Sequence, residues 1–183
     1  PNSELHLEDV GLNPSRTALL DVLDGMGADI TVENERVQGR EPVGDITVRS
    51  APLSGVEVGG RLIPNLIDEI PVLAVAAACA EGRTEIRDAH ELRVKETDRL
   101  RALAENLNAL GADVKEREDG LIIDGNGPNL LSTTVRSFGD HRIAMAMGVA
   151  GLVAHGSTAV NDAECAKVSF PGFWDELSRV ASF

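Results

Sequence analysis

Charged residues of both signs crowd into one short stretch of this sequence, Glu91-Leu-Arg-Val-Lys-Glu-Thr-Asp-Arg99, in which seven of nine residues are polar. Leucines follow it at helical spacing, so Lys95, Glu96 and Arg99 are predicted on or near the first turn of a helix, with Lys95 and Arg99 on one face. The free N–H groups at a helix start favour an anion. A carboxylate among cations is suited to proton transfer. The stretch therefore predicts an anion site with Glu96 as its acid–base group, and the alternative is a solvated turn with surface ion pairs.

Three more residues stand at predicted helix starts. Asp68 precedes an alanine-rich helix, where a lone Asp is more often an N-cap than a catalytic group. Asp140 opens an equivalent helix and invites the same N-cap interpretation. Arg142 follows it, although the helix dipole disfavours a cation there. A bound anion or a carboxylate would explain that placement, because a guanidinium can grip a carboxylate through two parallel hydrogen bonds.

Two further residues remain candidates. His141 suits either a base or a hydrogen-bonded structural histidine. Lys167 lies in the loop after a predicted strand, and Lys95 occupies the corresponding junction earlier in the chain. This correspondence predicts a shared anionic pocket at one end of the domain. The sequence contains no metal-ligand spacing, no glycine-rich phosphate loop and no Ser/His/Asp ordering, so we predict neither a metal nor a cofactor.

The elements that must position these residues follow from periodicity and turn residues. Strands are predicted at 5–10, 30–32, 45–48 and 84–87. A first helix is predicted to begin at Asn13-Pro14, with Asn13 as its N-cap, and to stop at Gly27. A nearly all-apolar helix over 68–80 must be buried on most sides. A last, amphipathic helix is predicted over 173–180.

The chain also repeats itself. Met26-Gly-Ala-Asp29 returns as Leu110-Gly-Ala-Asp113, and the alanine-rich block 74–89 returns as 148–163, each copy ending in Asp-Ala. The repeating unit is strand–helix–strand–strand–helix–strand. We therefore predict a single domain over 1–183, with internal repeats at about 3–87 and 83–163 followed by the C-terminal helix.

Composition narrows the class of protein. The 183 residues are 43% hydrophobic and 26% charged, which are globular values, and the net charge of −13 argues against nucleic acid as a partner. The longest apolar run is too short for a membrane span. The two cysteines indicate a reducing compartment, so we expect a cytoplasmic location. Because the sequence begins at Pro1 and enters a strand pattern almost at once, we expect it to be a piece of something longer.

Three motifs carry a family resemblance: Arg93-Val-Lys-Glu-Thr-Asp-Arg99, Asp140-His-Arg-Ile-Ala-Met-Ala146 and Cys165-Ala-Lys-Val-Ser-Phe-Pro171. Together with Ile63-Pro-Asn-Leu-Ile-Asp-Glu-Ile-Pro71, they resemble the C-terminal signatures of 5-enolpyruvylshikimate-3-phosphate (EPSP) synthases, in the same order. The resemblance implies an α/β (α+β) fold of the enolpyruvyl transferase type. This is an inside-out, barrel-like domain of repeated βαβαββ units with buried alanine-rich helices.

The resemblance also implies a reaction of the shikimate pathway, in which the enolpyruvyl group of phosphoenolpyruvate moves to the 5-hydroxyl of shikimate 3-phosphate without a metal. Asp68 would hold the shikimate hydroxyls and accept a proton, and Glu96 would protonate the methylene carbon and later remove that proton. Lys95 would contact shikimate 3-phosphate. Arg99, Arg142 and Lys167 would grip phosphoenolpyruvate.

Two departures qualify the resemblance. Some relatives have an Asn that touches the shikimate ligand five residues before the catalytic Glu, and Glu91 stands there in this chain. The family's N-terminal domain, a necessary partner in the site, is also absent, so we expect little activity from this chain alone. The alternatives are a UDP-N-acetylglucosamine enolpyruvyl transferase domain and a non-catalytic interaction domain. The second would be expected to lose the charged site residues, and all six are present.

Overall fold

The structure, a computed structural model, describes residues 2–181, so Pro1 and residues 182–183 lie outside it. The α-helices are α1 Ala18–Gly25, α2 Ile63–Leu66, α3 Ile70–Ala78, α4 Arg99–Ala109, α5 His141–Val153 and α6 Phe173–Val180. The strands are β1 Glu4–Gly11, β2 Asp29–Gln38, β3 Glu41–Arg49, β4 Glu57–Val58, β5 Glu81–Ile86, β6 Asp113–Arg117, β7 Gly120–Asn126, β8 Thr134–Arg136 and β9 Ala159–Asn161. Short 3₁₀ turns are η1 Gly60–Leu62, η2 His90–Val94 and η3 Ala163–Val168.

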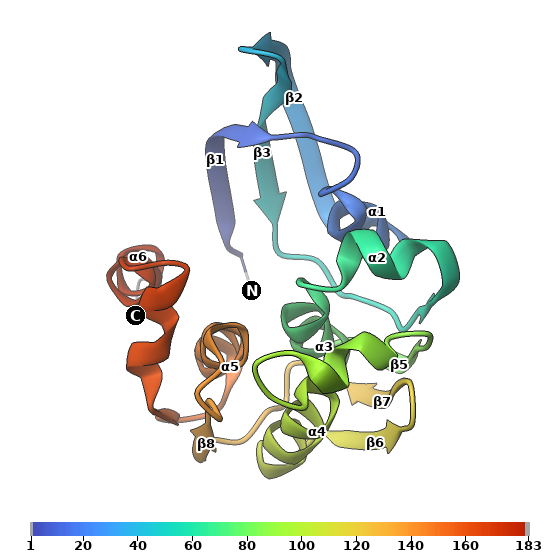
Figure 1. Ribbon diagram of the computed structural model, residues 1–183. Coiled ribbons are helices and arrows are strands. Elements are labelled where there is room, and N and C mark those ends of the chain that lie inside the picture. Colours follow the sequence, from blue (N-terminus) through green and yellow to red (C-terminus); the bar gives the residue numbers. More distant parts are fainter. Residues whose placement is uncertain (1, 182–183) are drawn as a thin grey trace.

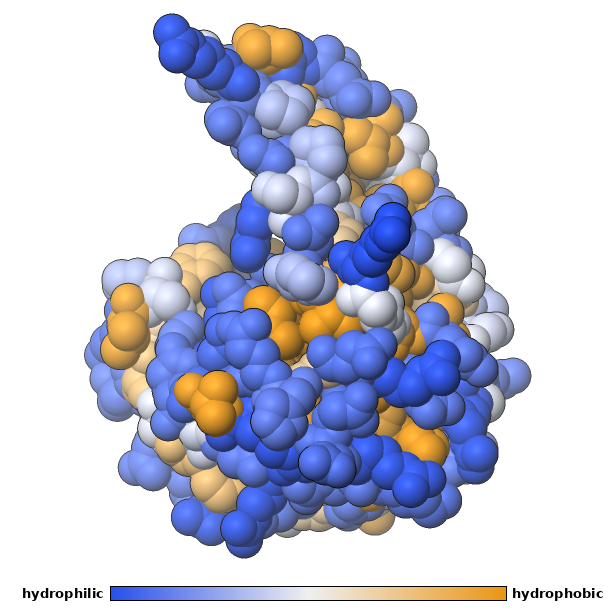
Figure 2. Space-filling view, turned by 45° about the vertical axis from the view of Figure 1, so that its right-hand side comes forward, coloured by the Kyte–Doolittle hydropathy of each residue, from blue (hydrophilic) through white to orange (hydrophobic). Residues whose placement is uncertain are grey.

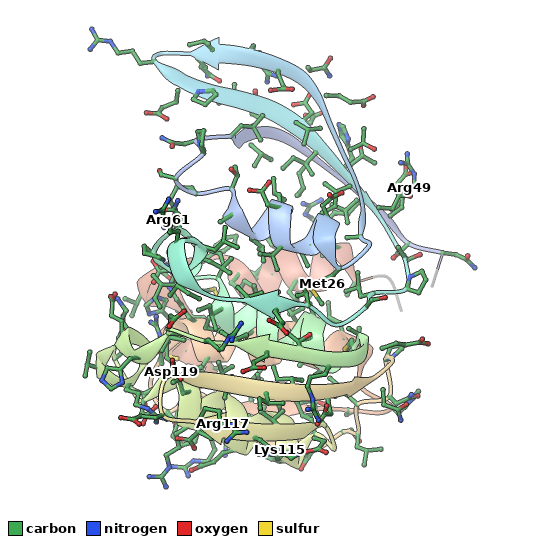
Figure 3. The ribbon with its side chains drawn as sticks, turned by 90° about the vertical axis from the view of Figure 1, so that its right-hand side faces the viewer. Met26, Arg49, Arg61, Lys115, Arg117 and Asp119 are labelled. Carbon is green, nitrogen blue, oxygen red and sulfur yellow. The ribbon has the colours of Figure 1, made fainter. Side chains whose placement is uncertain are left out.

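Three sheets form around a helical centre. The antiparallel sheet β1-β3-β2 stands out from the body of the molecule (Figure 1). A hollow with apolar residues on its floor lies beneath this sheet (Figure 2). The mixed sheet β4-β5-β7-β6 lies across one face of the central helices (Figure 3), and β8 pairs with β9 in parallel. The central helices therefore lie inside the body of the domain, with the mixed sheet covering one of their faces.

The two alanine-rich helices form the centre of the core. In α3, Leu73, Ala74 and Ala77 are fully buried, and in α5 Ala144 and Met147 are as well. The two helices pack against each other and carry almost no polar face. Such helices are buried all round because they offer no side to water. The prediction of buried alanine-rich helices is confirmed, and so is the last helix over 173–180.

Helix starts were predicted less well. The first helix begins at Ala18 and not at Asn13, because Asn13 Oδ1 accepts hydrogen bonds from the Ser15 N–H at 3.0 Å and hydroxyl at 2.8 Å and closes a separate turn. The helix predicted over 68–80 forms as α3, which spans only Ile70–Ala78, and Asp68 lies in the turn that separates α3 from the short preceding helix α2. Gly27, with a φ of +90°, follows the end of α1 as expected.

The division into two repeats remains a prediction. The two Asp-Ala pairs that close the proposed units share a backbone feature, because Asp88 and Asp162 have φ values of 61° and 55°. Non-glycine residues enter this left-handed region rarely. β5 and β9, which precede these residues, each pair in parallel with a short strand, β4 and β8 respectively.

Candidate active site

Asp68 lies at the centre of a group of arginines. Its carboxylate is 3.1 Å from Arg142 Nη2, 3.6 Å from Arg99 Nη1 and 3.9 Å from Arg16 Nη1. Its backbone carbonyl also accepts a hydrogen bond from Arg142 Nη1 at 3.0 Å. The N-cap interpretation of Asp68 is wrong, because α3 begins at Ile70 and has no side-chain cap. The side chain instead takes part in charge pairing from the turn before the helix.

Arg99 is the most buried cation of the group. Its side chain is 1% exposed, Nε donates to Asp140 Oδ2 at 2.7 Å, and Nη2 donates to Glu96 Oε2 at 2.6 Å. Its Nη1 is buried and has no hydrogen-bond partner among the described residues. A buried donor without a partner is costly, and native structures contain few of them. This nitrogen therefore marks a place where a bound anion would complete the hydrogen bonding.

Asp140 links two helix starts. Its Oδ1 accepts from the backbone N–H groups of Arg142 at 2.8 Å and Ile143 at 3.3 Å, which confirms the predicted N-cap of α5. Its Oδ2 holds Arg99, the first residue of α4. The starts of α3, α4 and α5 are consequently joined through Asp68, Arg99 and Asp140. Positive helix ends gathered in this way favour an anionic ligand.

The first turn of α5 carries two further candidates. A bound anion or a carboxylate was expected beside Arg142, and the structure shows that its partner is the Asp68 carboxylate. His141 Nδ1 lies 3.9 Å from Glu96 Oε1, too far for a hydrogen bond. Glu96 itself is 48% exposed, and its one hydrogen bond within residues 2–181 comes from Arg99. The carboxylate is therefore accessible to a substrate while remaining anchored to the buried cation.

The two candidate lysines stand apart from this cluster. Lys95 and Glu96 lie in bends before α4, which begins at Arg99 with Asp98 as its N-cap. Lys95 and Glu96 thus lie near the first turn of α4, as predicted, but outside the helix, so the prediction that Lys95 and Arg99 share one helix face is wrong. Lys95 pairs with Glu91, and Lys167 pairs with Glu164. The Glu164 hydrogen bond raises the pKa of Lys167. In the part of the chain that the structure describes, neither lysine contacts Asp68, Arg99 or Arg142.

Sequence reasoning missed three contributors. Asp140 was expected as a cap and not as the partner of Arg99. Arg16 donates to Glu69 Oε1 at 2.7 Å, beside its contact with Asp68. Neither Arg16 nor Glu69 stands in a pattern that indicates a site, because only the packing of the turn before α1 against the start of α3 brings them together. No sequence signal could have found that contact.

A small cavity adjoins the cluster. It has a volume of about 190 Å³ and is lined on its polar side by Asp68, Glu69 and Arg142. A larger hollow of about 800 Å³ between α5, β9 and α6 is lined by none of the six predicted site residues. Among residues 2–181, no group of three or more His, Cys, Asp or Glu side chains could hold a metal ion. No helix over the same range is long and apolar enough to cross a bilayer.

Comparison with known proteins identifies the family. The sequence model of EPSP synthase (3-phosphoshikimate 1-carboxyvinyltransferase) matches residues 1–177. A 3-phosphoshikimate 1-carboxyvinyltransferase of Salinibacter ruber is 85% identical over 181 residues, which are 99% of this chain and 42% of the relative. The one from Gloeobacter violaceus is 57% identical over 180 residues, covering 98% of this chain and 41% of the relative. The chain thus spans about two fifths of the length of the curated relatives it matches.

Comparison with solved structures leads to the same family. EPSP synthase from Acinetobacter baumannii superposes with a TM-score of 0.94 at 42% identity, over 99% of this chain and 42% of that one. The enolpyruvyl transferase NikO from Streptomyces tendae superposes with a TM-score of 0.73 at 23% identity, over 97% of this chain and 38% of that one, and this likeness shows the fold alone. The predicted enolpyruvyl transferase fold and the family resemblance are confirmed. This chain belongs to the EPSP synthase family.

Proposed function

We propose that this chain forms one part of the active site of a 3-phosphoshikimate 1-carboxyvinyltransferase, an enzyme of aromatic amino-acid and chorismate biosynthesis. The enolpyruvyl group of phosphoenolpyruvate is transferred to the 5-hydroxyl of shikimate 3-phosphate, and inorganic phosphate is released. The remaining three fifths of the relatives' length supplies the N-terminal domain that completes the site. The observation that carries the proposal is the buried Arg99 guanidinium, whose Nη1 has no hydrogen-bond partner among the described residues while Nη2 donates to Glu96.

Arg99 and Arg142 bind the anionic groups of phosphoenolpyruvate in this proposal. Arg142 is paired with Asp68, and both side chains are 28% exposed. A carboxylate or phosphate of the substrate therefore replaces Asp68 as the partner of Arg142. The guanidinium is already partly dehydrated, so binding does not require removal of a full hydration shell. Lys167 and Lys95 are paired with exposed carboxylates at the surface, so each can turn toward a ligand at small cost. Lys167 contacts phosphoenolpyruvate and Lys95 contacts shikimate 3-phosphate.

The proposed proton transfers use the two accessible carboxylates. Asp68 accepts the proton of the 5-hydroxyl as that oxygen attacks the central carbon of phosphoenolpyruvate, and Glu96 donates a proton to the methylene carbon. Phosphate then leaves, and Glu96 takes a proton back from the methyl group to restore the double bond. Each carboxylate lies within contact of an arginine, so charge that develops at the substrate meets fixed cations.

The setting of the reaction is part of the same proposal. The partners are two small anionic molecules, with neither nucleic acid nor membrane involved, in keeping with a net charge of −13. Cys79 and Cys165 are free thiols, which supports a cytoplasmic location. No metal or cofactor enters the proposed mechanism.

A chimera tests the proposal. This chain replaces the matching 181 residues of the Salinibacter ruber relative, and phosphate release is measured from phosphoenolpyruvate with shikimate 3-phosphate as acceptor. We expect turnover with this acceptor and none with UDP-N-acetylglucosamine, the acceptor of the alternative family. Turnover with UDP-N-acetylglucosamine alone, or a folded chimera that is inactive while the unaltered relative is active, would contradict the proposal.

A further inference from the structure

The Arg93 guanidinium donates four hydrogen bonds, more than any residue of the proposed site. Within the described residues, none of these bonds and none of its ion pairs involves the six site residues. Its Nε donates to the Glu118 carbonyl at 2.7 Å, and Nη2 donates to the Arg117 carbonyl. Its Nη1 donates to Asp98 Oδ2 at 2.8 Å and to Glu116 Oε1 at 2.7 Å. The side chain is only 20% exposed. Four acceptors arranged around one planar fork match arginine and no other side chain.

The contacts of Arg93 close a loop. Asp98 is the N-cap of α4, its Oδ1 accepting from the Arg101 N–H at 3.1 Å while Oδ2 accepts from Arg93. The Arg93–Asp98 pair therefore joins the two ends of residues 94–97, which include Lys95 and Glu96. Residues 95–97 form bends and belong to neither η2 nor α4. The Arg93–Asp98 ion pair thus holds the two ends of this loop together, where no backbone hydrogen bonds of a helix or strand within the described residues do so.

The hairpin that receives Arg93 is a rigid anchor. Arg117 and Asp119 lie at the turn between β6 and β7, and β7 is paired on both sides, with β5 and with β6 (Figure 3). A Cβ built on Gly120 would lie 1.8 Å from the Ile86 carbonyl oxygen, so the hairpin sits directly against the end of β5. The Asp119 carbonyl also accepts from the Ala89 N–H at 2.7 Å, just before η2. The hairpin position is therefore fixed independently of Arg93.

The loop needs this anchor because its functional side chains have few other contacts. Glu96 has a single hydrogen bond within the described residues, to Arg99, and Lys95 pairs only with the exposed Glu91. In contrast, Asp140 and Arg99 are locked by burial and by helix starts. A group that transfers a proton must be held within a fraction of an ångström of its productive position, and a displacement of 1 Å can cost about a hundredfold in rate.

We infer that Arg93 is a positioning residue of the transferase, which holds the loop of Lys95 and Glu96 in register with the buried Arg99–Asp140 pair by fastening that loop to the β6–β7 hairpin. This inference rests on the proposed function. It predicts that kcat depends on the planar, multi-donor guanidinium of Arg93, and that a positive charge at this position is not sufficient.

The test compares Arg93→Ala and Arg93→Lys with Arg83→Ala in the active chimera. Arg83 is a matched control because it also makes a two-pronged ion pair, with Asp124, but on the outer face of β5 and β7 away from the loop. We expect Arg93→Ala to lower kcat by about 10- to 100-fold. KM for phosphoenolpyruvate should change much less, because Arg99 and Arg142 remain. Arg93→Lys should recover only part of the loss, and Arg83→Ala should keep the parent kcat.

Amide hydrogen exchange supplies a readout that is independent of turnover. Residues 94–97 should exchange faster in both Arg93 variants, while β7 exchanges as in the parent. A kcat for Arg93→Ala within twofold of that for Arg83→Ala, a loss confined to KM, full recovery by Arg93→Lys, or unchanged exchange at 94–97 would each overturn the inference. If the parent chimera itself released no phosphate, the proposed function would fail, and exchange at 94–97 would still decide whether Arg93 holds the loop.

Discussion

Arg99 Nε and Asp140 Oδ2 are 2.7 Å apart, and their side chains are 1% and 0% exposed. The pair joins the first residue of α4 to the N-cap of α5, so one buried contact fixes two helix starts and the charges they carry. A buried ion pair of this kind is weak evidence for stability in itself, because desolvation offsets much of the attraction. Its value here is positional, since it fixes Glu96 on one side and Arg142 on the other.

Removing one member of this pair should be costly. Asp140→Ala leaves the buried Arg99 guanidinium without its main partner and removes the cap of α5, so the free energy of unfolding in urea should fall by about 3–5 kcal/mol. Asp140→Asn keeps acceptors for the cap and should lose less. Asp124→Ala is the control. It breaks the surface ion pairs of Asp124 with Arg83 and Lys115, of which the pair with Arg83 lowers the pKa of Asp124 and raises that of Arg83, and it should cost much less stability than Asp140→Ala. Equal losses for Asp140→Ala and Asp124→Ala would refute the account of the buried pair.

Two glycines of α5 should respond oppositely to alanine. A Cβ at Gly148 would lie 2.7 Å from the Trp174 ring, which packs α6 onto α5, whereas a Cβ at Gly151 would meet Thr158 at 3.4 Å, an ordinary contact. Gly148→Ala should destabilise by about 1–3 kcal/mol through overpacking, and Gly151→Ala should be neutral or stabilise by up to about 1 kcal/mol. Thermal unfolding measures both changes.

Fluorescence distinguishes the cause of the Gly148→Ala effect. Trp174 is the single tryptophan of the chain, and its indole N–H donates to the Ala163 carbonyl at 3.0 Å. Displacement of the ring should shift its emission in Gly148→Ala and leave it unchanged in Gly151→Ala. An unshifted emission in both variants, with equal stability, would show that α6 does not depend on this close approach.

The thiol of Cys79 should react slowly in the folded protein. It follows the last turn of α3, and burial raises its pKa to about 11 from an ordinary value of 9.0. At pH 8 the thiolate is then on the order of one molecule in a thousand, and this fraction rises about tenfold per pH unit up to pH 11. Mass spectrometry after iodoacetamide treatment should show labelling that follows this rise in the folded state. Labelling of Cys79 at pH 8 as fast as in urea would contradict the burial of this thiol.

Local patterns predicted the elements well where composition alone decides the environment. The alanine-rich helices have no polar face, so burial of α3 and α5 followed directly from the sequence. Their starts were harder to predict, because Asn13 and Asp68 are good N-cap residues whose side chains the fold uses for a turn and for ion pairs. Local preference was overridden there by contacts between distant segments.

In the candidate site, too, some features could be predicted from the sequence and others depend on contacts between distant segments. Glu96, Arg99 and Arg142 were selected by residue type and position and Asp68 by the family resemblance, and the structure brings the four together. Lys95 was misplaced because the helical spacing was extended three residues before the cap at Asp98, into the bends that precede α4. The Arg99–Asp140 pair and the contacts of Arg16 join parts of the chain that no periodicity relates, so only the three-dimensional structure could reveal them.

The most direct test of the central claim is the turnover of the chimera carrying Glu96→Gln. Gln keeps the size and hydrogen-bonding reach of Glu96 but cannot exchange a proton, so kcat should fall by about 10²- to 10⁴-fold while phosphoenolpyruvate still binds. Glu105→Gln, which alters an exposed carboxylate paired with Arg101 on α4, should retain the parent kcat. A Glu96→Gln chimera that releases phosphate as fast as the Glu105→Gln chimera would contradict the assignment of Glu96 as the proton-transfer group.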